Sequence, residues 1–287
     1  MNRTIRVYNS GVAIVTGGAS GIGKALAEEL AKRGCEVVLA DLQIESAEKI
    51  VSEIITSGGK ARAVEMNVTD FPAMERMVRE TADRTGRLDF IFNNAGIGIG
   101  GNVYHYDGIE DWDKIVDINF RGVVNGVQAA YKIMKDQGFG HIVNTASMAG
   151  LMPCPGMVSY AATKHAVVGL SKSLRAESAH LGIRVSVFCP GFVRTAIFDR
   201  GGKYGKMLME LTPEQDASYK EMIEKFKPIT PEIFAVKALD QVAKNKAIII
   251  VPAWWRLVWW IHRLFPTLGI SLAEKSFRDG QKKIGIE

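Results

Sequence analysis

Short apolar segments alternate with amphipathic helical patterns along most of the chain, and this alternation restricts the fold more than any other feature. The predicted strands cover residues 12–15, 36–40, 61–66, 88–92, 141–145, 184–189 and 247–251. Nearly continuous apolar runs of this length are typical of strands buried on both faces of a parallel sheet. Helical periodicity fills the intervals, as at 23–33, 44–57 and 72–85. The sequence therefore predicts an α/β fold, one doubly wound domain with a mainly parallel sheet of seven strands.

Two regions interrupt this rhythm. Residues 192–246 separate the last two predicted strands by more than one crossover helix requires, and they include a charged helical stretch at 213–227. Because long insertions in compact domains are usually lids or binding loops, we expect a substrate lid here. The sequence thus predicts one domain over residues 1–252. Residues 253–287 form a helical extension that packs on this domain, on a partner or on a membrane.

Composition excludes several classes of function. Hydrophobic residues make up 47% of the chain and charged residues 23%, as in ordinary globular proteins. The formal charge of +5 comes without a dense Lys/Arg run, so we expect no nucleic-acid partner. The cysteines form no CxxC pair and the histidines show no metal-ligand spacing, so we expect no disulfide framework and no metal site. The first residues contain no long apolar segment typical of a secretory signal, and we expect a cytoplasmic protein, with membrane association left open by the tail.

A glycine-rich stretch, TGGASGIGKAL, follows the first predicted strand and opens a helix. Gly17, Gly21 and Gly23 permit a tight turn, a close approach of the backbone and close helix packing. The free N–H groups and the positive dipole end of the helix would face a diphosphate. Asp41 ends the second predicted strand. An acid there accepts hydrogen bonds from ribose hydroxyls and repels a 2′-phosphate, so we expect NAD rather than NADP as the cofactor.

Further motifs follow in order along the chain. They are Thr16-Gly17-x3-Gly21-Ile22-Gly23, Asn93-Asn94-Ala95-Gly96, Asn119, Ser147, Tyr160-x3-Lys164 and Pro190-Gly191. Together they resemble the short-chain dehydrogenase/reductase family, over residues 11–251. The resemblance implies a Rossmann-type domain and an NAD-dependent oxidoreductase that interconverts an alcohol and a ketone.

The resemblance also implies a role for each matched residue. Tyr160 would be the general acid/base, and Ser147 would hydrogen-bond the substrate oxygen. Lys164 would bind the nicotinamide ribose and assist Tyr160, while Asn119 would hold a water that links Lys164 to solvent. The implied cofactor contacts are Gly17, Ser20, Gly21, Ile22, Gly23, Asp41, Asn67, Val68, Asn94, Ala95, Gly96, Tyr160, Lys164, Pro190, Gly191, Val193 and Thr195. Asn67 departs from the family pattern, which often has an acid here for the adenine amine, but an amide oxygen can accept the same hydrogen bond.

The spacing of Tyr160 and Lys164 would place both side chains on one helix face. A phenol titrates near 10, which is too high for a good base near neutral pH. A cation at about 4 Å is worth up to ~4 kcal/mol at an effective dielectric of about 20. We therefore expect Lys164 to lower the pKa of Tyr160 by roughly three units before desolvation opposes the shift.

Substrate contacts are expected in residues 97–107, 148–157 and the insertion. The segment MAGLMPCPGM at 148–157 is rich in Met and Pro and poor in hydrogen-bonding side chains. Since Met fills irregular apolar space, we expect a bulky hydrophobic secondary alcohol or ketone, such as a steroid, a retinoid or another lipid-like compound. The alternative, that these Met residues are ordinary core, stays open.

The tail at 253–265 carries four of the five Trp residues, with Arg256 and Arg263 on a narrow polar stripe. A helix of this length is too short to span a bilayer, which takes about 20 residues. Such a helix can lie in the lipid headgroup region, close the substrate pocket or cover a partner subunit. The family resemblance implies a homodimer or homotetramer. The alternatives to a freely diffusing enzyme are a non-catalytic NAD(H)-binding scaffold or sensor of the same fold and a peripheral membrane-binding member of the family.

Overall fold

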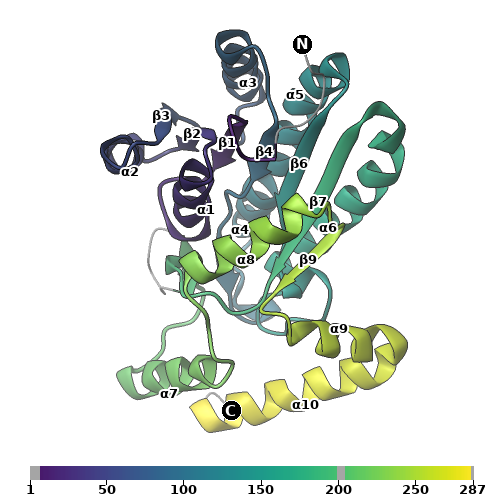
Figure 1. Cartoon of the computed structure of the whole chain (residues 1–287). Helices are drawn as coiled ribbons and strands as arrows, with labels where there is room; N and C mark the ends of the chain where they lie inside the picture. The colour runs from purple at the N-terminus through teal and green to yellow at the C-terminus, as the bar shows by residue number, and fades with distance from the viewer. Residues whose placement is uncertain (1–6, 199–203, 286–287) are drawn as a thin grey trace.

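A seven-stranded sheet, parallel in every pairing, forms the centre of the computed structural model, which describes residues 7–198 and 204–285 (Figure 1). The strand order is β3-β2-β1-β4-β6-β7-β9. The strands are β1 (Val12–Thr16), β2 (Glu36–Asp41), β3 (Lys60–Glu65), β4 (Phe90–Asn93), β6 (Gly140–Thr145), β7 (Ile183–Pro190) and β9 (Ile248–Val251). The order reverses between β1 and β4. In open α/β sheets, ligands bind at such a switch point, outside the carboxyl ends of the strands.

Helices cover both faces of the sheet. Buried residues of α1, α2 and α8 form one core with the sheet, and those of α3, α5 and α6 form the other. The helices are α1 (Gly21–Lys32), α2 (Ile44–Thr56), α3 (Phe71–Thr85), α4 (Glu110–Val116), α5 (Gly122–Gln137), α6 (Val158–Ser178), α7 (Pro213–Glu224), α8 (Pro231–Ala243), α9 (Trp255–Leu264) and α10 (Pro266–Ile284). Local signals set some boundaries. Asp70 caps α3 by accepting a hydrogen bond from the Ala73 N–H at 3.0 Å, and Gly86 ends this helix with φ 72°.

The predicted doubly wound, Rossmann-type domain is confirmed, and each predicted strand has its counterpart in the sheet. The expectation of burial on both faces is wrong for β3. This strand lies at the edge of the sheet, pairs with β2 on one side and leaves Lys60 and Glu65 exposed. Because an edge strand has one strand neighbour, a mixed polar and apolar sequence is tolerated there.

The insertion at 192–246, where a lid is expected, also contributes to the core. Helix α8 packs on the sheet as an ordinary crossover helix, whereas the charged stretch predicted at 213–227 forms the separate helix α7. A short strand, β8 (Gly205–Met207), pairs in parallel with β5 (Gly98–Gly100) outside the main sheet. Residues 199–203 of the insertion lie outside the described residues.

The predicted tail helix forms α9, which stops at Leu264 before Pro266 begins α10. Both helices lie together with α7 at one end of the molecule, beyond the end of β9 (Figure 1). The carbonyl of Gly285, just after α10, accepts a hydrogen bond from Gln215 of α7 at 2.9 Å. Lys283 forms an ion pair with Glu221 at 3.1 Å. These contacts fix the end of α10 against α7.

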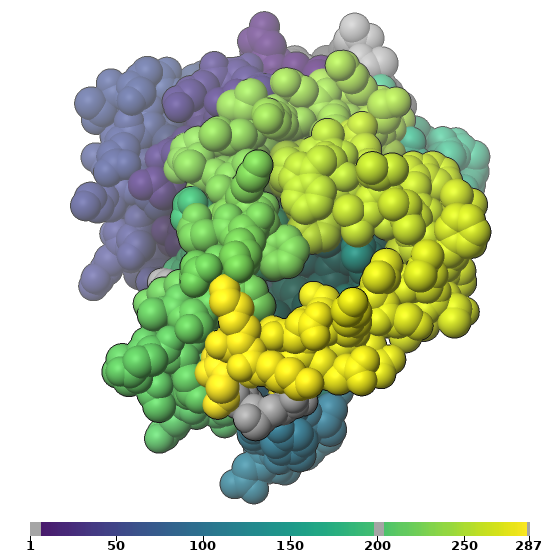
Figure 2. Space-filling model, turned by 90° about the horizontal axis from the view of Figure 1, so that it is seen from below, coloured from purple at the N-terminus to yellow at the C-terminus, as the bar shows by residue number. Residues whose placement is uncertain are grey.

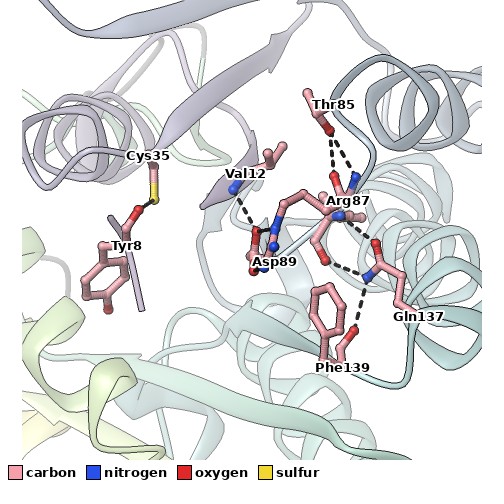
Figure 3. Close-up of polar contacts among 9 residues, drawn as sticks. Tyr8, Val12, Cys35, Thr85, Arg87, Asp89, Gln137 and Phe139 are labelled. Atoms are coloured by element: carbon pink, nitrogen blue, oxygen red, sulfur yellow. Dashed lines mark hydrogen bonds and ion pairs between the residues drawn. The ribbon is translucent and has the colours of Figure 1, made fainter. Parts of the chain in front are cut away.

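A polar network ties the amino ends of β1 and β4 together (Figure 3). The fully buried carboxylate of Asp89 accepts hydrogen bonds from the Val12 N–H at 3.0 Å and from Arg87 Nε at 2.7 Å. Gln137 accepts from the Leu88 N–H at 2.7 Å and donates to the Leu88 carbonyl at 2.9 Å. The network therefore holds β1 and β4 together at their amino ends, opposite the carboxyl ends of the strands.

His141 on β6 is buried and holds a neutral imidazole. Ser186 Oγ donates to the Lys246 carbonyl at 2.7 Å, so the His141 Nε2–H donates to Ser186 Oγ at 2.8 Å. Burial lowers the pKa of His141 to about 3, and the positive charges of Arg184 and Arg175 act in the same direction.

The substitution His141→Gln should reduce the loss of stability at acid pH. In the unfolded chain the imidazole takes up a proton near 6.5, whereas in the folded protein it does so only near 3. Between these values the unfolded state binds the extra proton, so stability is lost as pH falls, by roughly 1.4 kcal/mol per pH unit for this group. Urea unfolding at pH 7 and pH 4.5 checks this. Equal losses of unfolding free energy in the parent and the variant would contradict the assignment.

Candidate active site

A cavity of about 930 Å³ lies at the carboxyl ends of the strands. Its walls come from the turn after β1, the ends of β2, β4, β6 and β7, and the helices α7, α9 and α10. From below, the molecule is visibly hollowed between the green segment that holds α7 and the yellow α9–α10 segment (Figure 2). The switch point of the sheet, the α7 segment and the α9–α10 segment thus all border the same cavity.

The glycine-rich turn after β1 forms a close-fitting cradle on one side of this cavity. Gly17 and Gly21 have φ values of 64° and 51°, which favour glycine. A Cβ on Gly23 would lie 1.9 Å from the Gly17 carbonyl oxygen, so only glycine fits behind the turn. Ser20 begins α1 without a side-chain cap bond to any described residue. The first-turn N–H groups of α1 therefore suit an anionic group in the cavity.

Asp41 at the end of β2 is buried and borders the same space. Its carboxylate accepts hydrogen bonds from the Ala19 N–H and the Gln43 N–H, each at 2.9 Å. The Asp41 carboxylate therefore stabilises the glycine-rich turn through the hydrogen bond from Ala19. Since a carboxylate has about four lone-pair sites, these two bonds leave capacity for a ligand hydroxyl.

The side chains of Ser147, Tyr160 and Lys164 meet where β6 and α6 border the cavity. The Ser147 hydroxyl lies near the Tyr160 phenol and interacts with it. Lys164 Nζ donates to the Thr145 carbonyl at 2.9 Å and lies 5.5 Å from the centroid of the Tyr160 ring. One turn of α6 thus brings the phenol and the ammonium to the same wall, as the sequence spacing predicts.

The expected lowering of the Tyr160 pKa is wrong for this structure. Burial raises the pKa of Tyr160 to about 12, the nearby Ser147 hydroxyl opposes the rise, and the nearby Cys154 adds to it. Burial also lowers the pKa of Lys164 to about 8. Desolvation is the largest cause of both shifts, since Lys164 is buried and Tyr160 is half-buried in the cavity wall. Lys164 Nζ is directed to the Thr145 carbonyl.

Most of the predicted site residues line the cavity. These are Gly17, Ser20, Gly21, Ile22, Asp41, Asn67, Val68, Asn94, Ala95, Gly96, Ser147, Tyr160, Lys164, Pro190, Gly191, Val193 and Thr195. Gly23 and Asn119 lie behind this wall. Asn119 sits in a π-helical turn between α4 and α5, where its amide accepts from the Ile97 N–H at 2.8 Å and donates to the Ile97 carbonyl at 2.9 Å. It thereby fixes the segment next to Gly96, and the water that it would hold stays a prediction.

The predicted substrate segments also reach the cavity. From 148–157 the lining residues are Met148, Ala149, Met152, Pro153, Cys154, Pro155, Gly156 and Met157. The insertion adds Tyr204, Met207, Met209 and Leu211. Met148 is at the same time a buried member of the core, so the two interpretations of these Met residues both hold for it. The part of the cavity lining that these two segments contribute is predominantly apolar.

An aromatic cluster beside Gly191 was not foreseen from the sequence. Phe192 stacks on Phe226 with ring centroids 4.6 Å apart, and Phe226 stacks on Trp255 at 6.0 Å. A Cβ on Gly191 would lie 2.3 Å from Trp255 Nε1, so the indole presses directly on this glycine. The buried Nε1 has no hydrogen-bond partner in the part of the chain that the structure describes. No local signal links positions so distant in the sequence.

The tail contributes to the cavity wall, which was one of three expectations for it. Val258, Ile261 and His262 line the cavity from α9, and Leu272 and Phe277 do so from α10. A Cβ on Gly156 would lie 3.2 Å from the Phe277 ring, so α10 reaches the predicted substrate segment.

Comparison with known proteins agrees with this geometry. Residues 11–203 match the family model described as short chain dehydrogenase. The chain is 38% identical to the cyclohexanol dehydrogenase of Acinetobacter sp. (strain SE19), over 66% of this chain and 76% of the relative. It is 34% identical to the levodione reductase of Leifsonia aquatica, over 80% of this chain and 87% of the relative. A short chain dehydrogenase/reductase from Burkholderia phymatum, solved in complex with NAD, superimposes with a TM-score of 0.81 at 27% identity, covering 92% of this chain and 96% of that one.

Proposed function

Because the chain belongs to the short-chain dehydrogenase family, we propose that it interconverts a hydrophobic secondary alcohol and its ketone with NAD as the cofactor. One observation carries this proposal: the glycine-rich cradle, the Ser147–Tyr160 pair and an apolar wall all border a single cavity. Family membership supports dehydrogenase or reductase chemistry in general. The cofactor choice and the substrate are the proposed refinements.

The residues at the cavity fit a nicotinamide dinucleotide. The uncapped first turn of α1 suits the diphosphate, Asp41 suits a ribose, and residues 190–193 border the opposite end near Tyr160. When bound, the nicotinamide would donate or accept a hydride. The cofactor would carry only the hydride, so a side chain of the protein would have to transfer the proton.

Ser147 would orient the substrate oxygen, and Tyr160 would give or take the hydroxyl proton. With a pKa of about 12, the phenol is protonated at neutral pH and is ready to donate to a ketone oxygen. In the oxidation direction its pKa has to fall, and the ammonium of Lys164 is the nearby charge that favours the phenolate. Both directions thus use the same pair.

The choice of NAD rests on Asp41. Its carboxylate borders the cavity beside the glycine-rich turn, where a 2′-phosphate would meet a like charge. The NAD-bound relative from Burkholderia phymatum supports the same choice.

The substitution Asp41→Asn should raise the NADP/NAD ratio of kcat/KM by about tenfold, which corresponds to removing roughly 1.4 kcal/mol of repulsion. Asn retains an oxygen that can accept the hydrogen bond from Ala19, so the turn should survive. The matched control is Glu65→Gln, which removes a charge from the paired position of the neighbouring strand β3 and should leave the ratio unchanged. A parent protein that already prefers NADP would overturn the electrostatic assignment.

The apolar wall supports a hydrophobic substrate, with steroids, retinoids and other lipid-like alcohols as candidates. The names of the cyclohexanol dehydrogenase and levodione reductase relatives add cyclic alcohols and ketones to this set. A panel of cyclic and long-chain secondary alcohols, incubated with NAD and followed by absorbance of the reduced nicotinamide, tests the proposal. Turnover confined to polyols and sugars would refute the substrate class. We also propose a homodimer or homotetramer, on the family resemblance alone.

A further inference from the structure

The outer surface of α9 and α10 is unusually apolar. Large hydrophobic side chains on these helices and at their ends are between 41% and 66% exposed. We call them the hairpin surface: Trp254, Leu257, Trp260, Ile261, Leu264, Phe265, Leu268, Ile270 and Leu272. Single exposed hydrophobic residues are normal in soluble proteins, but a group gathered on two adjoining helices marks an interaction site.

The charges of α9 and α10 are mostly positive. Their cations are Arg256, Arg263, Lys275, Arg278, Lys282 and Lys283, and their carboxylates are Glu274 and Asp279. The Arg263 guanidinium lies over the rings of Trp259 and Trp260, at 5.5 and 5.7 Å from their centroids. Trp and Arg side chains combined on one helix are typical of segments that lie in the headgroup region of a bilayer. This surface therefore complements anionic headgroups.

The hairpin surface also adjoins the cavity. Ile261 and Leu272 are more than 40% exposed and at the same time line the cavity. The hollow in Figure 2 opens between α7 and the helices α9 and α10. Because Ile261 and Leu272 both line the cavity and are exposed, they lie at its opening. A layer that covers the hairpin surface would meet the opening of the cavity.

A second copy of the chain fits this surface less well than a lipid bilayer does. In a two-fold symmetric contact the same patch meets itself. The cations of α9 and α10 outnumber Glu274 and Asp279, so a predominantly positive surface would then meet an equally positive one. Like charges in an apolar contact are costly. Anionic lipid supplies the missing negative charge.

We propose that the hairpin surface docks on an anionic lipid bilayer, with the cavity opening toward the acyl chains. Among residues 7–198 and 204–285, no helix is long and apolar enough to cross a membrane, so the contact is with the bilayer surface. A hydrophobic substrate could then enter the cavity directly from the lipid. This last step rests on the proposed function, whereas the docking does not.

Co-sedimentation of the full chain with vesicles tests the docking without any substrate. The parent should bind phosphatidylcholine vesicles that contain phosphatidylglycerol and bind pure phosphatidylcholine much less. The test variant is Trp260→Ser/Leu264→Ser/Phe265→Ser/Leu268→Ser, whose four positions lie outside the cavity lining. It should lose about tenfold or more in vesicle affinity. The matched control is Ile55→Ser/Ile109→Ser/Ile233→Ser/Val236→Ser, which removes exposed apolar side chains elsewhere and should bind like the parent.

A second measurement locates the contact. Four of the five Trp residues lie at 254–260, so vesicles with brominated acyl chains should quench most of the tryptophan emission of the parent. Circular dichroism and turnover of a water-soluble alcohol should be equal in parent and variant. This equality separates a failure of docking from a failure of the proposed function.

Three results would overturn the proposal. The parent could stay in the supernatant with anionic vesicles, or the test variant could bind as tightly as the parent. Analytical ultracentrifugation could also show that the test substitutions split an oligomer of a parent that ignores vesicles. That last outcome would assign the hairpin surface to a second copy of the chain.

Discussion

Tyr160→Phe should lower turnover by about a thousandfold, which is the usual scale for loss of a positioned general acid or base. The substitution removes one oxygen atom, the phenol oxygen near Ser147, and leaves the ring in place. The remaining lining of the cofactor end is unchanged. Binding of reduced cofactor, followed by its fluorescence, should therefore stay close to that of the parent.

Tyr106→Phe is the matched control for this experiment. Its hydroxyl bonds Ser159 Oγ at 2.7 Å, one residue from Tyr160, but Tyr106 lies outside the cavity lining. Loss of its phenol oxygen should leave turnover near that of the parent. If Tyr160→Phe kept its turnover, the acid/base role would be excluded, and a non-catalytic NAD(H)-binding scaffold or sensor would become the better interpretation.

The electrostatics of Tyr160 show where sequence reasoning reaches its limit. The spacing of Tyr160 and Lys164 correctly predicts that both reach one wall. It does not reveal how deeply each is buried or that Lys164 is held by the Thr145 carbonyl. Burial of both groups depends on α6, β6 and the loops packing together, so the direction of the pKa shift follows from the fold and not from the motif.

The fold itself was largely predictable because its determinants are local. Apolar runs identify the strands, and the glycine-rich turn has a steric requirement that is visible in the sequence and borne out at Gly23. The incorrect expectation that β3 is buried on both faces could also have been avoided from the local sequence, since Lys60 and Arg62 interrupt the apolar pattern of this strand. These features concern neighbouring residues, for which patterns in the sequence carry most of the information.

The far wall of the cavity was not predictable in the same way. Trp255 reaches Gly191, and Phe277 reaches Gly156, across long stretches of chain. The sequence shows that the tail is apolar and helical, but such a face can cover a pocket, a subunit or a membrane. The structure places one side of α9 and α10 on the cavity, so the pocket alternative is confirmed for that side. The exposed outer side leaves the subunit and membrane alternatives as predictions.

The network around Asp89 gives the largest expected effect on stability. Asp89 is fully buried, and its carboxylate is the acceptor for both the Val12 N–H and the guanidinium of Arg87 (Figure 3). Arg87 is itself mostly buried and lies 4.9 Å from the centroid of the Phe139 ring. Removing the carboxylate leaves a cation and a backbone N–H enclosed without this acceptor. The cost of breaking such a pair exceeds the net value of the intact pair.

Asp89→Ala should therefore lower the free energy of unfolding by about 3–5 kcal/mol. Urea unfolding, followed by circular dichroism, measures the change. The matched control is Glu75→Ala, which breaks the surface pairs with Lys132 at 2.9 Å and Arg79 at 3.5 Å and should cost no more than about 1 kcal/mol. The double variant Arg87→Met/Asp89→Leu should recover part of the loss, because it removes the enclosed cation together with its partner. If Asp89→Ala cost no more than Glu75→Ala, the network would not stabilise the amino ends of the strands, since a buried acceptor would then be worth no more than an exposed one.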